Sequence, residues 1–317
     1  ASGVLNIASI SSVFDKKLYK PLAPLSALLA VAFLIAGLIV LVLDLGKPDR
    51  LIVAMTTYNF KSIFSWNIFL YSGFAVVLAI YMWTMLDREV NRFSKYAGTF
   101  AFGWRIILTT GTGSIFGFLV AREAYATAIL APLFIVMSLL YGTAVYYLIL
   151  KTISKFHNTY ISDDVVKNLR KLTIMFLFAN LYFLFLYHIT NMYIAKHLEY
   201  EIFILSSGGI YTIAFWVGQL FVGIILPIIL MNSSRLSVEH SLILSSILIL
   251  IGSFVAMYVI IIGGQAYPLT IFPDHVIIQS SFYDNVVHSY MPSLYELGLG
   301  LGGVALALII CLLYTSD

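Results

Sequence analysis

Four ionisable side chains stand where an otherwise apolar sequence should not hold a charge: Asp44, Glu123, His188 and Glu296. Each lies inside a long apolar run or at its edge. Carboxylates and imidazoles often exchange protons with substrates near neutral pH, and ionisable groups are costly to keep in a membrane. These four residues are therefore the candidate catalytic groups, with acid–base chemistry on a bound ligand as their predicted role.

Two of the acids have basic neighbours. Asp44 precedes Arg50 in the sequence LDLGKPDR (43–50), and Glu123 directly follows Arg122. In a structural interpretation, Asp44 is a polar helix end that reaches into the lipid headgroups, and Glu123 is satisfied by Arg122 or by a neighbouring loop. In a functional interpretation, Asp44 ties down Arg50 or takes a proton from a ligand. Removal from water would raise the pKa of Glu123 until this residue exchanges protons near neutral pH. The sequence leaves both open.

His188 is the only histidine inside an apolar run, which covers 172–195. It either makes a structural hydrogen bond or takes part in proton transfer. Haem held by two histidines would need a second one at a similar depth. The remaining histidines fall in loops or at the ends of runs: His157, His197, His240, His275 and His288. No haem is therefore expected in this chain.

Glu296 opens the last apolar run, three positions after Ser293 and six after Tyr290. An acidic side chain in the first turn of a helix interacts favourably with the helix dipole, which is a sufficient structural reason for it. Alternatively, Tyr290, Ser293 and Glu296 form one stripe, provided that the helix starts early enough.

The elements that must position these residues are membrane-spanning helices. Apolar residues make up 61% of the 317 residues and charged residues only 10%, unlike a soluble domain. Charge-free runs recur along the chain without the two-residue alternation of barrel strands. Since backbone amides in lipid must be paired within a segment, these runs are helices. The predicted fold class is all-α, a polytopic helical membrane protein with one integral membrane domain over residues 1–317.

Eight complete spans are expected, preceded by an apolar stub at 1–14. The stub Val4–Phe14 has eleven residues, where a span needs about 20, and is interpreted as the remnant of a truncated span. The eight spans cover 25–43, 63–86, 101–120, 127–151, 171–194, 208–231, 241–263 and 293–314.

Basic residues divide unequally between the two sides of these spans. Thirteen fall on one side, Arg105 among them, against five on the other. By the positive-inside rule the richer side is cytoplasmic. The extracytoplasmic loops are then 44–62, 121–127, 195–207 and 264–292. The last is long and holds Asp274, His275, Asp284 and His288, as expected of a functional or docking loop.

Composition also excludes several kinds of site. A single cysteine, Cys311, excludes a disulfide framework, a four-thiolate iron–sulfur cluster and a zinc site with paired cysteines. A net charge of only +3 without a basic run excludes nucleic acid as a partner. Glycine clusters at 111–113 and 298–303 lie inside spans, where they favour helix packing. Any redox centre must therefore belong to another subunit.

Several motifs occur together in a known order. LDLGKPDR (43–50) is followed by KSIFSWN (61–67) and APLF (131–134). The pattern continues through Tyr193, Glu201, Gly208, Trp216, Gly218 and Pro227, and ends with Tyr290, Pro292, Ser293 and Glu296. Over nearly its whole length the chain resembles the NrfD/PsrC superfamily of polysulfide reductase membrane subunits, and most closely its longer branch with HybB-type and DsrP-type subunits.

The resemblance implies ten spans, so that one helix and most of a second precede Ala1. It also implies a menaquinone- or ubiquinone-type quinone as substrate, bound near the extracytoplasmic face, without haem or metal in this chain. Electrons would be exchanged with an extracytoplasmic, ferredoxin-like iron–sulfur subunit of a respiratory oxidoreductase in the cytoplasmic membrane of a prokaryote. Relatives often have a histidine in the span equivalent to 101–120, and this chain has none. The quinone protons would then fall to Asp44, Glu123, His188 and Glu296.

Six further residues are expected to bind the quinone. Its ring would pack near Trp66 and Tyr125, while Arg50 and Arg122 stabilise the negatively charged oxygens of a reduced quinone. Gln265 and Tyr290 line the same outer rim.

Two other functions stay open. In a transporter or ion-conducting subunit, Asp44, His188 and Glu296 would form a relay across the membrane. Against this, the middle of the spans holds few titratable groups, and no pair of broken helices marks a binding site. An inert anchor that only tethers a complex would need none of these residues.

Overall fold

A computed structural model describes residues 2–13, 16–268, 287 and 290–315, and every regular element in these ranges is a helix. The predicted all-α fold is therefore confirmed. Seven helical segments are long and apolar enough to cross a membrane: Leu18–Asp44, Ile63–Leu86, Leu130–Phe156, Asp163–Tyr193, Ile210–Asn232, Val238–Ala266 and Leu294–Cys311. The chain is a multi-pass membrane protein.

One of the eight predicted spans, 101–120, is helical but is not among these seven segments. It lies in α5 (Ser94–Gly117), whose 24 residues would extend about 36 Å at ~1.5 Å per residue. Arg105 and a series of serines, threonines and glycines make α5 less apolar than the other long helices. The predicted count of eight is therefore not confirmed.

The chain forms two compact units. Unit 1 consists of Ala1–Thr112, Ser138–Leu169 and Pro292–Asp317, and unit 2 of Gly113–Met137 and Arg170–Met291. Three long helices contribute residues to both: α5, α6 (Leu130–Phe156) and α7 (Asp163–Tyr193). Helix α7 begins eight residues before the predicted span 171–194, with Asp163 and Asp164 in a first turn where acidic side chains are favourable.

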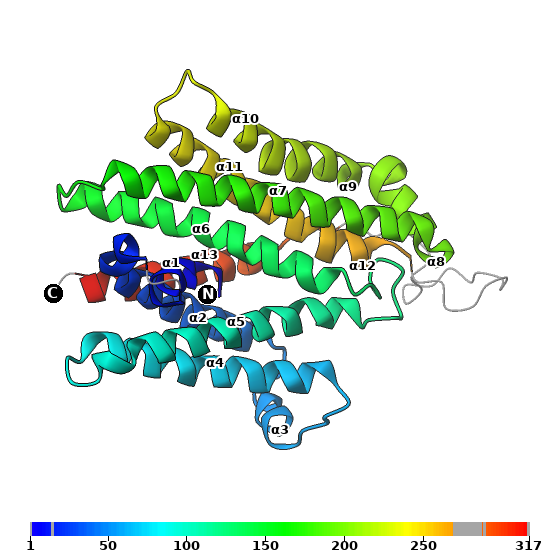
Figure 1. Cartoon of the computed structure of the whole chain (residues 1–317). Helices are drawn as coiled ribbons and strands as arrows, with labels where there is room; N and C mark the ends of the chain where they lie inside the picture. The colour runs from blue at the N-terminus through cyan, green and yellow to red at the C-terminus, as the bar shows by residue number, and fades with distance from the viewer. Residues whose placement is uncertain (1, 14–15, 269–286, 288–289, 316–317) are drawn as a thin grey trace, which may run out of the picture. The chain divides into compact units, whose positions relative to one another are not determined.

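Unit 1 is built around α2 (Ala23–Asp44), which contacts α1 (Asn6–Val13), α4 (Ile63–Leu86) and α13 (Leu294–Thr315) (Figure 1). Core residues of α2 recur at positions 23, 27, 30 and 34. This helical spacing gives one apolar stripe, which is buried in the same cluster as Phe74, Leu78 and Tyr81. The short α3 (Arg50–Thr56) has no buried residue.

The predicted stub is a short apolar helical segment, Gly3–Val13, that belongs to the core of unit 1. It lies so close to α6 that a Cβ atom on Gly3 would stand 1.8 Å from the carbonyl oxygen of Ser138. The Nδ2 atom of Asn6 donates to the carbonyl oxygen of Leu139 at 2.9 Å. Only glycine allows this approach, so the stub and α6 pack backbone against backbone.

Arg105 lies at the middle of α5 and not at the basic rim to which its sequence position assigned it. Its side chain is only 3% exposed. Its Nη1 atom donates to the side-chain oxygen of Asn6 at 2.6 Å and to the carbonyl oxygen of Ser2 at 2.9 Å. Arg105 therefore does not belong to the predicted group of thirteen basic residues on the cytoplasmic side.

Unit 2 packs α11 (Val238–Met257) against α10 (Leu226–Asn232) and the π-helical segment Ala214–Ile225 (Figure 1). A Cβ atom on Gly252 would lie 2.2 Å from the Cα atom of Gly223. Two glycines thus bring these helices into backbone contact, as small residues commonly do in membranes.

Two further π-helical segments, Phe203–Ser207 and Tyr258–Gly263, also belong to unit 2. They adjoin three short helices: α8 (Ala195–Ile202), α9 (Ile210–Ile213) and α12 (Gly264–Ala266). π-helical turns are rare and occur often at functional sites, which directs attention to this unit. Most of the predicted long loop, with Asp274, His275, Asp284 and His288, lies outside the described residues.

Candidate functional site

The candidate site is centred on the connection between α5 and α6, residues 118–129 of unit 2, hereafter the 118–129 loop. Three side chains donate hydrogen bonds to its carbonyl oxygens. Lys196 Nζ reaches Val120 at 2.9 Å, Tyr187 Oη reaches Ala124 at 2.8 Å, and His197 Nδ1 contacts the carbonyl oxygen of Glu123. Side chains of α7 and α8 thus satisfy three of the loop's backbone oxygens and tie the loop to these helices.

Arg122 anchors the loop to the end of α12. Its Nη1 atom donates to the carbonyl oxygens of Gln265 at 2.9 Å and Tyr267 at 3.2 Å. The hydroxyl of Tyr267 in turn donates to Oε2 of Glu199 at 3.3 Å. The structure thus brings together Arg122 and Gln265, two of the predicted quinone-binding residues.

Tyr125, also predicted to contact quinone, is packed inside unit 2 and is only 1% exposed. Its hydroxyl donates to the carbonyl oxygens of Ile260 at 2.9 Å and Ile261 at 3.2 Å. Burial raises the pKa of Tyr125 to about 12, so the phenol stays protonated at neutral pH. These contacts favour a structural role, and its contact with a ligand stays a prediction.

Glu123 is the acid of the 118–129 loop, and its carboxylate is only partly solvated. Its Oε2 atom is buried and has no hydrogen-bond partner among the described residues. Burial raises the pKa of Glu123, and the negative charge of Glu199 raises it further, while His197 and Lys196 act in the opposite direction. A carboxyl group with a raised pKa and an unused oxygen is suited to accepting or donating a proton.

His188 forms a pair with a carboxylate that was not among the predicted site residues. Its Nδ1 atom contacts Oε1 of Glu201, whose side chain is fully buried. Asn191 donates through Nδ2 to Oε2 of the same carboxylate at 3.3 Å, and the Oδ1 atom of Asn191 is buried without a described partner. The His188 ring also meets the Phe215 ring edge-on, with centroids 4.6 Å apart. An imidazole backed by a buried carboxylate is a common proton-transfer arrangement.

Helix α8 supplies most of these partners because of its residue spacing. His197, Tyr200 and Glu201 are buried, whereas Lys196 and Glu199 are exposed. Residues three and four apart share one face of a helix, so this eight-residue amphipathic helix turns its histidine and one glutamate inward.

The chain matches a known family over most of its length. The family model described as polysulphide reductase, NrfD, matches residues 1–268. The chain belongs to the NrfD family. The resemblance inferred from its motifs is thereby confirmed.

Two relatives of the NrfD-family chain match it over almost its whole length. It is 27% identical over 313 residues to the Hdr-like menaquinol oxidoreductase integral membrane subunit of Archaeoglobus fulgidus, covering 98% of this chain and 78% of that protein. It is 22% identical over 351 residues to a selenate reductase subunit of Mesobacillus selenatarsenatis, covering 98% and 80%. A putative dimethyl sulfoxide reductase membrane subunit of Halobacterium salinarum is 26% identical over 164 residues, which is 45% of this chain and 38% of that protein.

Four predicted site residues of this NrfD-family chain belong to unit 1: Asp44, Arg50, Trp66 and Glu296. Asp44 ends α2 and Arg50 begins α3, both are exposed, and no ion pair joins them in the described structure. Trp66 lies in the first turn of α4, with its Nε1 atom donating to the carbonyl oxygen of Phe60 at 2.9 Å. The contact with Arg50 that one functional interpretation gave to Asp44 is therefore not observed among the described residues.

Glu296 caps the helix that it opens. The backbone N–H of Ser293 donates to Oε2 of Glu296 at 2.6 Å, and the N–H of Glu296 donates to the Ser293 hydroxyl at 3.3 Å. This reciprocal pair is a capping box. Because α13 begins at Leu294, Tyr290 and Ser293 precede the helix, and the predicted stripe of Tyr290, Ser293 and Glu296 along one face is wrong.

Four members of the site were not predicted from the sequence: Asn191, His197, Glu199 and Glu201. Two signals were available. Glu201 is one of the residues that carry the family resemblance, and the spacing of residues 197, 200 and 201 is that of an amphipathic helix. No group of three His, Cys, Asp or Glu side chains in the described part of the chain is arranged to hold a metal ion. The chemistry that the site offers is proton transfer and hydrogen bonding.

Proposed function

We propose that this chain is the quinone-reactive membrane subunit of a multi-subunit oxidoreductase, and that Glu123, His188, Asn191 and Glu201 form its quinol site. Membership of the NrfD family supports the general function. The name of the Archaeoglobus relative, a menaquinol oxidoreductase membrane subunit, supports a menaquinone-type quinone as the substrate.

The observation that carries the proposal is two unused acceptors in unit 2, the unit that also holds the buried imidazole–carboxylate pair of His188 and Glu201. Oε2 of Glu123 and Oδ1 of Asn191 are both buried without a described hydrogen-bond partner. A buried acceptor without a donor is unfavourable by about 1–3 kcal/mol, so such atoms are usually reserved for a ligand or water. A quinol has two hydroxyl groups, which are donors of the kind that these oxygens need.

Proton transfer then follows from the hydrogen bonds of the site. Oxidation of a quinol releases two electrons and two protons. Glu123, with its raised pKa, accepts one proton at Oε2, and His188 accepts the other while Glu201 stabilises the imidazolium. The same groups return the protons when a quinone is reduced, so the site is compatible with either direction of electron flow.

The electrons pass to or from a partner subunit in this proposal. The matched relatives are named as membrane subunits of oxidoreductases, which supports further subunits. We assign the iron–sulfur partner to the side of the 118–129 loop and α8. The excess of basic residues on the opposite side supports an extracytoplasmic location for this side.

The remaining predicted site residues are not part of the proposed quinol site. Asp44, Arg50 and Trp66 lie in unit 1, and Glu296 is occupied as a helix cap. Their contribution to quinone binding, and that of Tyr290, stays a prediction.

The test is quinol-dependent turnover of the complete complex in native membranes. Glu123→Gln and His188→Gln keep size and hydrogen-bonding capacity but remove the proton-accepting groups, so each should lower turnover by 100-fold or more, within the roughly 10²–10⁴ range of a lost acid–base group. Glu89→Gln, an exposed glutamate in the connection between α4 and α5, is the matched control and should leave turnover unchanged. Native gel electrophoresis verifies assembly. Full turnover in both assembled variants would overturn the proposal.

A further inference from the structure

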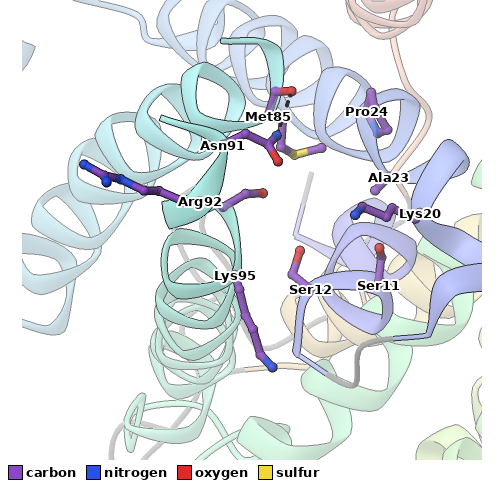
Figure 2. Close-up of a pocket in the computed structure, with 10 residues that line it drawn as sticks. Ser11, Ser12, Lys20, Ala23, Pro24, Met85, Asn91, Arg92 and Lys95 are labelled. Carbon is purple, nitrogen blue, oxygen red and sulfur yellow. Dashed lines mark hydrogen bonds between the residues drawn. The ribbon is translucent and has the colours of Figure 1, made fainter. Parts of the chain in front are cut away.

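A basic cavity of about 260 Å³ opens at one end of unit 1, where α2 begins, α4 ends and α5 begins (Figure 2). Three cationic side chains line it, Lys20, Arg92 and Lys95, and no acidic side chain does among the described residues. The polar part of the lining is completed by Ser11, Ser12, Asn91 and Ser94. The cavity lining therefore combines hydrogen-bond donors with positive charge.

The cations reach the cavity from different elements. Figure 2 shows the ammonium group of Lys20 close to Ser11 and Ser12, while the side chains of Arg92 and Lys95 extend away from them. The guanidinium carbon of Arg92 lies 4.8 Å from the centre of the Phe93 ring. All three cationic side chains are exposed at this rim, so an anion arriving from solvent meets them first.

A second cavity, of about 210 Å³, continues from the first. The two share Pro24 and Met85, and the rest of the second is lined only by apolar side chains: Leu25, Ala27, Leu28, Met82 and Leu86. These residues follow α2 from its first turn and α4 back from its last, so the groove enters the apolar part of unit 1 by about 6 Å, one helical turn.

We propose that the two cavities bind one anionic phospholipid, with its phosphate beside Lys20 at the rim that Arg92 and Lys95 also line and an acyl chain against α2 and α4. Lysine and arginine bind phosphate oxygens through charge-assisted hydrogen bonds, which the serine hydroxyls supplement. Basic pockets between membrane helices commonly hold anionic lipid head groups. A free phosphate ion would leave the apolar groove unfilled. A neutral quinone would not require three cations.

Two acidic residues of the described chain, close in sequence to the lining, lie outside the cavity, whereas Asp15 falls outside the described residues. Asp87 and Glu89 belong to the connection after α4, and neither lines the cavity. The Oδ1 atom of Asp87 accepts a hydrogen bond from the backbone N–H of Glu89 at 2.9 Å, within their own turn. The described residues of the lining are thus basic or uncharged.

Native mass spectrometry of the full-length protein in detergent tests the proposal. Phosphatidylglycerol is compared with phosphatidylcholine of the same acyl chains, and with glycerol 3-phosphate, which has the phosphate but no chain. We expect phosphatidylglycerol to bind at least tenfold more tightly than phosphatidylcholine, and glycerol 3-phosphate to bind too weakly to detect. Equal binding of the two lipids would overturn the proposal, and so would equal binding of glycerol 3-phosphate and the lipid, because the site would then be an ion site.

Two variants locate the site. Lys20→Gln/Arg92→Gln/Lys95→Gln should lower the affinity for phosphatidylglycerol by about 100-fold, at roughly fivefold per charge. Lys155→Gln/Lys167→Gln/Lys171→Gln removes the same charge from exposed positions outside the cavity and should leave the affinity unchanged. Leu25→Trp fills the apolar groove and should weaken lipid binding at least tenfold. If the two triple variants behave alike, or if Leu25→Trp binds the lipid normally, the location is wrong.

Discussion

His188 and Glu201 are thirteen residues apart in the chain and in direct contact through Nδ1 and Oε1. Helix α7 ends at Tyr193 and α8 begins at Ala195, so a single residue, Ile194, redirects the chain and brings the carboxylate back to the imidazole. This short connection joins the end of a membrane span to a surface helix. The proton-transfer groups of the proposed site are therefore held by the bend itself.

The His188–Glu201 contact should be visible as a coupling of stability. His188→Phe leaves Glu201 buried with Asn191 as its remaining hydrogen-bond donor in the described structure, and we expect a loss of about 1–3 kcal/mol in unfolding free energy. The double variant His188→Phe/Glu201→Leu replaces both polar groups and should recover part of this loss. Thermal unfolding of the purified protein in detergent measures each effect. Strictly additive losses would show that the two side chains do not interact.

Glu123 should make stability depend on pH. Folding raises its pKa above the ordinary value of 4.5, so the folded protein favours the protonated form. From about pH 4.5 upward to the raised pKa, the wild-type protein binds the proton more tightly when folded and loses stability as that proton leaves. Glu123→Gln lacks this loss, so its advantage in melting temperature over wild type should grow with pH in this window. Parallel curves for the two proteins would contradict the raised pKa.

Glu199 offers a second control on that titration. Its negative charge is a cause of the raised pKa of Glu123, so Glu199→Gln should lower this pKa. On the acid side of the pH profile, the rate of quinol turnover rises as Glu123 loses its proton, and this rise, the acid limb, should move to lower pH in the variant. An unchanged limb would mean that Glu123 does not govern it.

The backbone contact between Gly223 and Gly252 should tolerate no side chain. A Cβ atom on Gly252 would lie 2.2 Å from the Cα atom of Gly223, so Gly252→Ala should destabilise unit 2 by about 1–3 kcal/mol. Gly103→Ala is the matched control, since its Cβ atom would meet nothing within 4 Å, and alanine should there add up to about 1 kcal/mol to the stability of α5. Melting temperatures in detergent distinguish the two. Similar melting temperatures would show that α11 can move away.

Glu296 allows its two interpretations to be separated. A capping box functions with glutamine as well as with glutamate, whereas a proton donor does not. Glu296→Gln should therefore keep quinol turnover and stability, while Glu296→Ala should lower stability by about 0.5–2 kcal/mol. Loss of turnover in an assembled Glu296→Gln variant would restore the catalytic role predicted from the sequence.

The spans could be predicted closely because hydropathy is a local property. The predicted span 63–86 agrees with α4 to the residue, and the other six differ mainly at their ends. The misassignment of Arg105 has a physical reason: a buried arginine is acceptable where Asn6 and Ser2 supply acceptors, and that partnership joins segments about 100 residues apart.

The sequence by itself determined that this chain is a helical membrane protein of the NrfD type, and that its acids and histidines are few enough to single out. Only the tertiary structure decided which of them meet. It placed His188 against Glu201 and tied the loop that carries Glu123 to α8, and it showed Glu296 as a helix cap. Long apolar runs are recognised one segment at a time, whereas hydrogen bonds reach only about 3 Å, so their partners depend on how the helices pack.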